Sequence, residues 1–229
     1  LVIGVVTNNQ DPEGMGRVKV KFPWFSDNNE SAWARLVTPM AGAERGFWYL
    51  PEIDDEVLVA FEHGDIHRPF VLGALWNGQD KPPMTASEAV GGDGRVNKRV
   101  LKSRSGHTVT LDDTAGGEEI TIVDKTGENK IVLHSPDNSL QIKVQGDLTI
   151  EAQGKITLKA MSGVEMSSQT EVKISGQSGV DVSSQAQLKL AGQAGAELSS
   201  NVQTTVKGTL VNVEGSGPVT VTGTPIKLN

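Results

Sequence analysis

The C-terminal part of the chain repeats one pattern of apolar and polar residues every eight positions. Apolar pairs, separated by one polar residue, recur from 140/142 to 204/206, and Thr204 is the one exception. The register then slips by one residue, to 211/213. Runs of Gly, Ser, Gln and Ala between the pairs predict turns, because these residues bend easily. A short repeat of this length indicates a β-solenoid, with about five residues in each strand and about three in each turn.

One chain cannot bury this pattern alone. Each inward side chain contributes ~1.5–3 kcal/mol when fully buried, whereas ordering the backbone costs ~1–2 kcal/mol per residue. Three chains wound around one axis would close the gaps between coils and form sheets with strands ~4.8 Å apart. We therefore predict an all-β chain in which residues 140–229 form a trimeric, intertwined, triangular-prism β-helix spike with its tip. The side chains predicted to fill the trimer core are Val164, Met166, Val172, Ile174, Val180, Val182, Leu188, Leu190 and Leu198.

A sixteen-residue period is superimposed on the period of eight. Ser-Ser-Gln or Ser-Ser-Asn ends at 169, 185 and 201, whereas Gly-Gln ends at 177 and 193. The residue inside each pair also alternates in charge. In an intertwined prism, octad n of one chain lies beside octad n+1 of another, so opposite charges would form ladders on the outer faces. Chance alternation on a solvated face is the alternative. The predicted ladder residues are Glu165, Lys173, Asp181, Lys189 and Glu197.

Residues 1–78 predict a small all-β domain that forms a closed barrel. In residues 16–22, polar and apolar positions alternate, so Val18, Val20 and Phe22 should share a buried face. All ten aromatic residues lie between Phe22 and Trp76. We expect the four tryptophans, Trp24, Trp33, Trp48 and Trp76, to pack in the core or between domains. Strand-like runs lie at 1–7, 16–22, 32–38, 46–52, 55–65 and 68–77.

Residues 79–139 connect the two periodic parts. Residues 79–97 contain two prolines and several glycines and predict a linker or an extended strap. Residues 98–139 regain strand character at 107–113, 118–124 and 129–135, with tight turns between these runs. We therefore predict a linker followed by a β-rich neck.

Composition excludes several classes of function. The net charge is −7 and lysine and arginine do not cluster, so a nucleic-acid partner is not expected. The chain contains no cysteine, and no apolar run is long enough for a membrane-spanning helix. The chain starts at Leu1, inside a strand-like run and without an initiator Met. We expect an upstream part in the full protein; ordinary processing is the alternative.

Isolated candidates for chemistry do not form a convincing site. His63 and His67 are expected in a turn between strands, where Arg68 pairs with an acid. His107 lies close in sequence to Ser103 and Asp112, but these residues crowd one strand, which disfavours a catalytic triad. The glycine-rich run 91–95 has no following helix to cradle a phosphate. We predict no catalytic residue, no metal site and no cofactor.

Three segments in the first 77 residues, together with the octads, carry a family resemblance. They are DPEGMGRVKVKFPW at 11–24, WARLVTPMAG at 33–42 and GFWYLPEIDDEVLVAFEHGDIHRPFVLGALWN at 46–77. The chain resembles the central spike of contractile injection systems. This family includes the valine-glycine-repeat (VgrG) spikes of type VI secretion, baseplate assembly protein V of phage tails, and the spikes of extracellular phage-tail-like particles.

The resemblance implies an oligonucleotide/oligosaccharide-binding (OB) type barrel at residues 1–78, ahead of the trimeric spike. It implies a membrane-puncturing role in a homotrimer, with hub, baseplate and inner-tube proteins as partners on the N-terminal side. It also implies assembly in the bacterial cytoplasm and delivery outward on contraction, with transient contact to the target envelope. A PAAR-repeat tip protein would sit on a C-terminal platform made of Thr224, Pro225, Ile226, Lys227, Leu228 and Asn229. The alternatives are the stalk of a phage-like adhesin and a spike that carries an effector enzyme.

Overall fold

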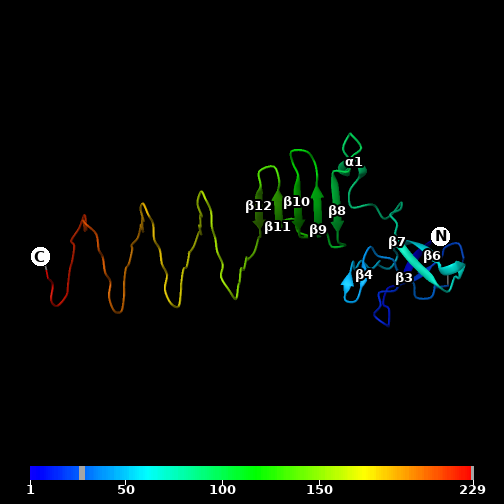
Figure 1. Cartoon of the computed structure of the whole chain (residues 1–229), viewed down its shortest axis with the longest axis horizontal. Coiled ribbons are helices and arrows are strands. Elements are labelled where there is room, and N and C mark those ends of the chain that lie inside the picture. The colour runs from blue at the N-terminus through cyan, green and yellow to red at the C-terminus, as the bar shows by residue number, and fades with distance from the viewer. Residues whose placement is uncertain (26–28, 228–229) are drawn as a thin grey trace. The chain divides into compact units, whose positions relative to one another are not determined.

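The computed structural model describes residues 1–25 and 29–227. It separates the chain into two compact units, Leu1–Ala152 and Gln153–Asn229 (Figure 1). The first unit contains two five-stranded sheets. Over the described ranges, no helix is both long enough and apolar enough to cross a bilayer. Leu228 and Asn229 of the predicted tip platform lie outside the described residues.

The first sheet is a curled, barrel-like sheet with the strand order β2-β1-β6-β7-β3. Its neighbouring strands pair antiparallel, except that β3 and β7 are parallel. A bridge between Val18 and Ala34 joins segments beside the two edge strands, which curls the sheet toward closure. The bounds are β1 (Val2–Asn8), β2 (Lys19–Lys21), β3 (Arg35–Leu36), β6 (Glu56–Phe61) and β7 (Pro69–Ala74).

The core of this sheet consists mainly of valines. The alternation predicted for residues 16–22 is confirmed, because Val18 and Val20 are fully buried and Phe22 is 7% exposed. β-Branched residues suit the interior of a small curled sheet, where little space separates opposing strands. The buried set is Val6, Val18, Val20, Phe22, Ala34, Val57, Val59 and Val71.

The tryptophans were predicted to pack in the core or between domains. Packing in the core is wrong for three of the four, and packing between domains stays a prediction. Trp24, Trp48 and Trp76 are 57–70% exposed, and Trp33 is half-buried. Among the described residues, the buried core of this sheet consists of valines with Phe22 and Ala34. Trp33 instead lies beside two cations, with Lys19 Nζ 5.4 Å from the ring centroid.

The run at 46–52 is not a strand beyond its first residue. It follows a two-stranded hairpin, β4 (Ala41–Gly42) and β5 (Arg45–Gly46). Its aromatic residues interact locally: Phe47 stacks on Tyr49 at 6.2 Å, and the ring of Trp48 fills the space that a Cβ at Gly16 would occupy. The consecutive apolar residues 47–50 therefore pack within a loop.

The linker contains one short helix that the sequence analysis missed. α1 (Ala86–Ala89) begins after Thr85, and the Glu88 carboxylate accepts a hydrogen bond from the Thr85 backbone N–H at 2.7 Å. Thr85 and Glu88 form a capping box, the S/T-x-x-E pattern that marks the start of a helix. A turn, η1 (Glu62–Gly64), lies between β6 and β7.

The second sheet is an antiparallel meander with the order β12-β11-β10-β9-β8 (Figure 1). The predicted turns are confirmed by Gly117 N–H to Thr114 C=O, Gly127 N–H to Asp124 C=O, and Asn138 N–H to Ser135 C=O. Three strands match the predicted runs, and β8 and β12 extend the sheet on either side. The bounds are β8 (Lys98–Lys102), β9 (Thr108–Asp112), β10 (Glu119–Val123), β11 (Lys130–His134) and β12 (Ser139–Lys143).

The tail bends with the predicted period. Bends lie at 145–146 and then every eight residues as far as 209–210. The next bend, at 216–217, comes seven residues later, which confirms the register slip. Between the bends the backbone is extended, and in the described part of Gln153–Asn229 these straight segments form no ladder with one another.

Candidate functional site

The apolar pairs of the tail lie open in a single chain. The nine side chains predicted for the trimer core are between 53% and 83% exposed. The five predicted ladder charges, Glu165 to Glu197, are exposed as well. Because one chain supplies one apolar pair every eight residues, with no second chain beside it, these pairs stay uncovered. The core and ladder therefore remain predictions that only additional chains can fulfil.

Two kinds of corner alternate along this tail. At three corners a serine hydroxyl accepts a hydrogen bond from the backbone N–H two residues on: Ser168 from Thr170 at 3.2 Å, Ser184 from Ala186 at 3.4 Å and Ser200 from Val202 at 3.3 Å. The corners between them contain a glycine at a position that excludes a side chain. A Cβ at Gly176 or Gly192 would collide with the carbonyl oxygen three residues later. The sixteen-residue period in the sequence is therefore a period of corner type.

The neck sheet carries an open apolar face. Its strands alternate, so that one face presents only aliphatic side chains except for Arg99 at one edge. By strand pairing these side chains form two rows across the sheet. One row is Leu101, Val109, Ile122, Ile131 and Ile142, and the other is Leu111, Ile120, Leu133 and Leu140; all nine are 37–62% exposed.

The opposite face of the neck sheet is mainly polar, although Val100, Val123 and Val132 also lie on it. Its middle row contains Thr110 and Thr121, which are directly paired across β9 and β10. An ion pair at its edge joins Lys98 Nζ to the Asp112 carboxylate at 3.2 Å. Water can therefore cover this face, whereas the aliphatic face requires another apolar surface.

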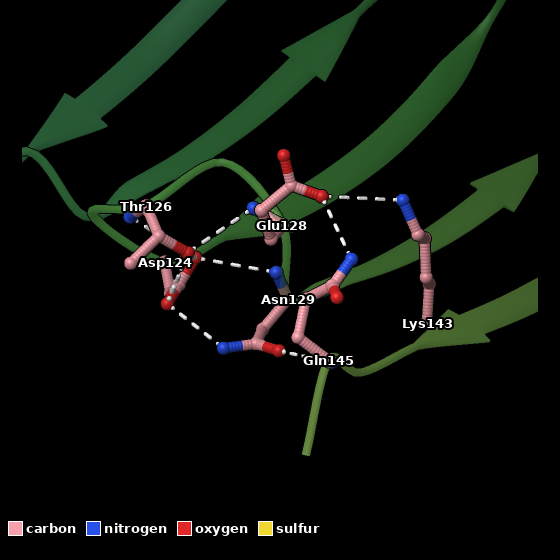
Figure 2. A network of polar contacts seen from close by, with 6 residues as sticks. All are labelled: Asp124, Thr126, Glu128, Asn129, Lys143 and Gln145. Atoms are coloured by element: carbon pink, nitrogen blue, oxygen red, sulfur yellow. Dashed lines mark hydrogen bonds and ion pairs between the residues drawn. The ribbon is translucent and has the colours of Figure 1, made fainter.

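A network of polar contacts fastens the neck to the start of the octads (Figure 2). The Asp124 carboxylate accepts hydrogen bonds from the Thr126 hydroxyl at 2.7 Å and from Asn129 Nδ2 at 3.0 Å. Asn129 Oδ1 in turn accepts the backbone N–H of Gln145 at 2.9 Å. The Glu128 carboxylate contacts Lys143 Nζ at 3.3 Å and Gln145 Nε2 at 3.0 Å. The turn between β10 and β11 thus positions the first bend of the tail.

Acid is expected to destabilise this network. The hydroxyl of Thr126 and the donors of Asn129 lower the pKa of Asp124 below its ordinary value of 3.8. A carboxyl with a lowered folded-state pKa stabilises the fold above 3.8, and this contribution is lost as the pH falls through the lowered value. We predict a progressive drop in the thermal midpoint below about pH 4, measured by circular dichroism. Asp124→Asn should flatten the drop, whereas Asp147→Asn, at an exposed position, should not.

Comparison with known proteins decides what the first sheet is. Residues 2–76 match the family described as the type VI secretion system/phage-baseplate injector OB domain. The match covers about a third of the chain and coincides with the curled five-stranded sheet and its valine core. The resemblance inferred from the sequence is confirmed for this part of the chain, which is called the injector OB domain below.

The chain is also homologous to VgrG proteins. It is 31% identical over 153 residues to the actin cross-linking toxin VgrG1 of Vibrio cholerae, a match that covers 61% of this chain and 13% of that protein. It is 33% identical over 138 residues to the type VI secretion system spike protein VgrG1b of Pseudomonas aeruginosa, covering 58% and 17%. The VgrG1a spike protein of the same organism matches at 33% over 127 residues, covering 54% and 18%. The chain thus spans less than one fifth of these curated relatives.

In the injector OB domain, Asp11 organises the loop between β1 and β2. Its side chain is only 2% exposed, and its oxygens accept hydrogen bonds from the backbone N–H groups of Glu13 at 3.1 Å and Met15 at 3.0 Å. Arg17 donates to it from the backbone at 3.2 Å, and from Nε at 2.9 Å and Nη2 at 2.7 Å. The Arg17 guanidinium and these amides hold the pKa of Asp11 far below its usual range. Gly14 and Gly16, both at positive φ, let the loop turn around the carboxylate.

The isolated candidates for chemistry do not converge in the part of the chain that is described. His63 lies in η1, and Arg68 pairs with Glu62 at 3.3 Å, as expected for a polar turn. The Ser103 hydroxyl accepts from the backbone N–H of His107, while His107 Nδ1 accepts from the Lys125 N–H at 3.2 Å. These contacts do not build a Ser-His-Asp relay. Within the described ranges, no three acidic, histidine or cysteine side chains gather as a metal site.

Proposed function

We propose that three copies of this chain wind their tails into the puncturing needle of a contractile injection machine. The observation that carries the proposal is the presence, in one chain, of an injector OB domain and a tail that bends every eight residues with its apolar pairs exposed. Such pairs gain free energy only when they leave water. Two further tails supply the missing surface without any other component.

The needle's work is mechanical in this proposal. Wound strands lie across the long axis, so thrust compresses stacked hydrogen-bonded sheets, and breakage requires three chains to separate together. Backbone ladders between chains would satisfy the N–H and C=O groups that one tail leaves unpaired. No catalytic step is assigned to residues 1–229. The type of machine is left at the level of the family: type VI secretion, phage tail or extracellular particle.

The two ends of the needle have different partners in the proposal. The injector OB domain faces the hub, baseplate and tube proteins, and the assembly forms in the bacterial cytoplasm before it is driven outward. The tip platform, of which Thr224 to Lys227 are described, receives a PAAR-repeat tip protein. Ile226 is 48% exposed there and offers an apolar contact. The target envelope is touched only on contraction.

Molecular mass in solution tests the proposal. Light scattering on the full chain should give three times 24.3 kDa, and the species should persist in mild detergent, because wound chains cannot dissociate one at a time. A folded species of 24.3 kDa at micromolar concentration would contradict the needle. Co-purification of a PAAR-repeat protein with the intact chain, lost when Thr224–Asn229 are removed, tests the platform separately.

A further inference from the structure

An octad tail by itself does not define how three chains are aligned. A shift of one chain by eight residues again places an apolar pair opposite an apolar pair. A shift of sixteen also restores the corner type, because glycine corners recur at Gly176 and Gly192 and serine corners at Ser168, Ser184 and Ser200. It restores the sign of the charge inside the pair as well, since Glu165, Asp181 and Glu197 are sixteen apart. Repeats with a flat, regular pattern are prone to such slippage.

The neck sheet has no such repeat. Its strands differ in sequence and are joined by turns that are not all of one length. Each strand contributes one residue to each of the two aliphatic rows, except β8, which contributes to one of them. These rows are open in a single chain although they contain nine aliphatic side chains. Apart from Arg99 at one edge, the polar side chains of the five strands lie on the other face, where Lys98 pairs with Asp112. The aliphatic face therefore needs a partner that is apolar and that fits in one register.

We propose that this face is covered by the same face of two other copies, and that this contact sets the register in which the tails wind. The inference rests on the proposed trimeric needle. Two observations favour copies of this chain as the occupant. The last members of the two rows, Leu140 and Ile142, are also the first apolar pair of the octad series, and the pair at 148/150 follows eight residues later within the same unit. The rows also match the predicted core of the tail in containing aliphatic side chains without aromatic rings.

The network of polar contacts shown in Figure 2 would transmit this register from the neck to the tail. Gln145, at the first bend, is held by the Asn129 and Glu128 side chains of the turn between β10 and β11. Once three neck sheets have docked, the three first bends start at the same level. Winding then proceeds from a common origin, and slipped alignments cannot begin.

Single-cysteine reporters test the inference in the full chain, which has no natural cysteine. Val180→Cys reports aligned chains, because equivalent residues meet at a threefold axis and form a disulfide on oxidation. A mixture of Val180→Cys and Ala196→Cys chains reports a slip of sixteen residues, through a 180–196 disulfide found by peptide mass spectrometry. In the otherwise unchanged chain, the 180–180 disulfide should dominate.

The neck variant is Ile120→Asp on the aliphatic face, and the matched control is Thr121→Asp, the next residue, on the polar face. Ile120→Asp should lower the yield of the 180–180 disulfide roughly tenfold relative to Thr121→Asp, because a carboxylate cannot be buried unpaired between apolar sheets. The remaining trimers should contain the 180–196 disulfide; a monomer would equally show that the face joins the copies. A milder pair is Ile131→Thr on the aliphatic face and its control, Val132→Thr, on the opposite face. Both substitutions preserve β-branching. Ile131→Thr should lower the yield of the 180–180 disulfide relative to Val132→Thr, but by less than Ile120→Asp does.

The outcomes separate this inference from the proposed function. A trimer in which Ile120→Asp and Thr121→Asp give equal yields of the 180–180 disulfide would overturn the role of the neck and leave the needle intact. A monomer in the chain without neck substitutions would instead overturn the needle itself. Circular dichroism checks that each variant retains the β-sheet signal. If Ile120→Asp loses this signal, the comparison of Ile131→Thr with Val132→Thr decides the result.

Discussion

Val180→Asp combined with Val182→Asp should convert the proposed trimer into a monomer. Both side chains are predicted to point at the shared axis, so the double variant places two carboxylates per chain, six per trimer, in one apolar layer. Burying an unpaired ion costs several kcal/mol even after relaxation, and the lost aliphatic burial adds ~1.5–3 kcal/mol per side chain. Light scattering or analytical ultracentrifugation at micromolar concentration should report the loss.

The matched control changes the charge equally at a corner. Ser184→Asp with Gln185→Asp adds the same two carboxylates at exposed positions. An aspartate at 184 can still accept the hydrogen bond that Ser184 receives from the Ala186 N–H. This control should remain trimeric. If the axial and corner variants dissociate alike, charge in general and not axial burial is responsible, and the assignment of the trimer core is wrong.

Asp11→Ala should strongly destabilise the injector OB domain. The substitution leaves the backbone N–H groups of Glu13, Met15 and Arg17 without their acceptor and removes the counter-ion of the Arg17 guanidinium. Unsatisfied donors in a nearly buried site are among the larger causes of destabilisation. The thermal midpoint of the domain, followed by tryptophan fluorescence, should fall by roughly 10 °C.

Asp11→Asn provides the intermediate case. The amide keeps one acceptor oxygen and loses the charge, so its midpoint should lie between those of the natural chain and Asp11→Ala. Glu13→Ala is the matched surface control, because its carboxylate contacts Arg17 at 3.1 Å but is 64% exposed; such exposed pairs contribute little. Equal midpoints for Asp11→Ala and Glu13→Ala would show that Asp11 does not organise the loop. The tryptophans report on this domain specifically, because all four lie before residue 77.

Local repetition made the tail the most predictable part of this protein. The eight-residue spacing, the slip before residue 211 and the positions of the bends all follow from which residues are apolar and which are small. The alternation of Val18, Val20 and Phe22 was predictable for the same reason, since neighbouring strand residues point to opposite faces. The helix at α1 was also readable, from the Thr85 and Glu88 capping box, but a four-residue helix is easily overlooked in a linker rich in glycine and proline.

Features that depend on distant residues were not predictable. The sequence does not reveal that Trp24, Trp48 and Trp76 lie outside a valine core, because this depends on how tightly the sheet curls. The five hydrogen bonds to Asp11 come from residues close in the sequence, Glu13, Met15 and Arg17, and they were not predictable either, because the φ angles of Gly14 and Gly16 decide how the loop turns.

The sequence by itself determined the periods: eight residues per bend, sixteen per corner type, and two apolar side chains per straight segment. Such periods are properties of neighbouring residues, and backbone geometry converts them directly into faces and turns. Only the tertiary structure decided that residues 139–143 pair antiparallel with β11 as the fifth strand of the neck sheet, and that the aliphatic residues of its strands align in two uncovered rows. Strand pairing joins residues far apart in the chain, and one-residue shifts exchange the faces of a strand. For that reason the aliphatic face of the neck, on which the proposed contact between copies rests, follows from the tertiary structure and not from the sequence pattern alone.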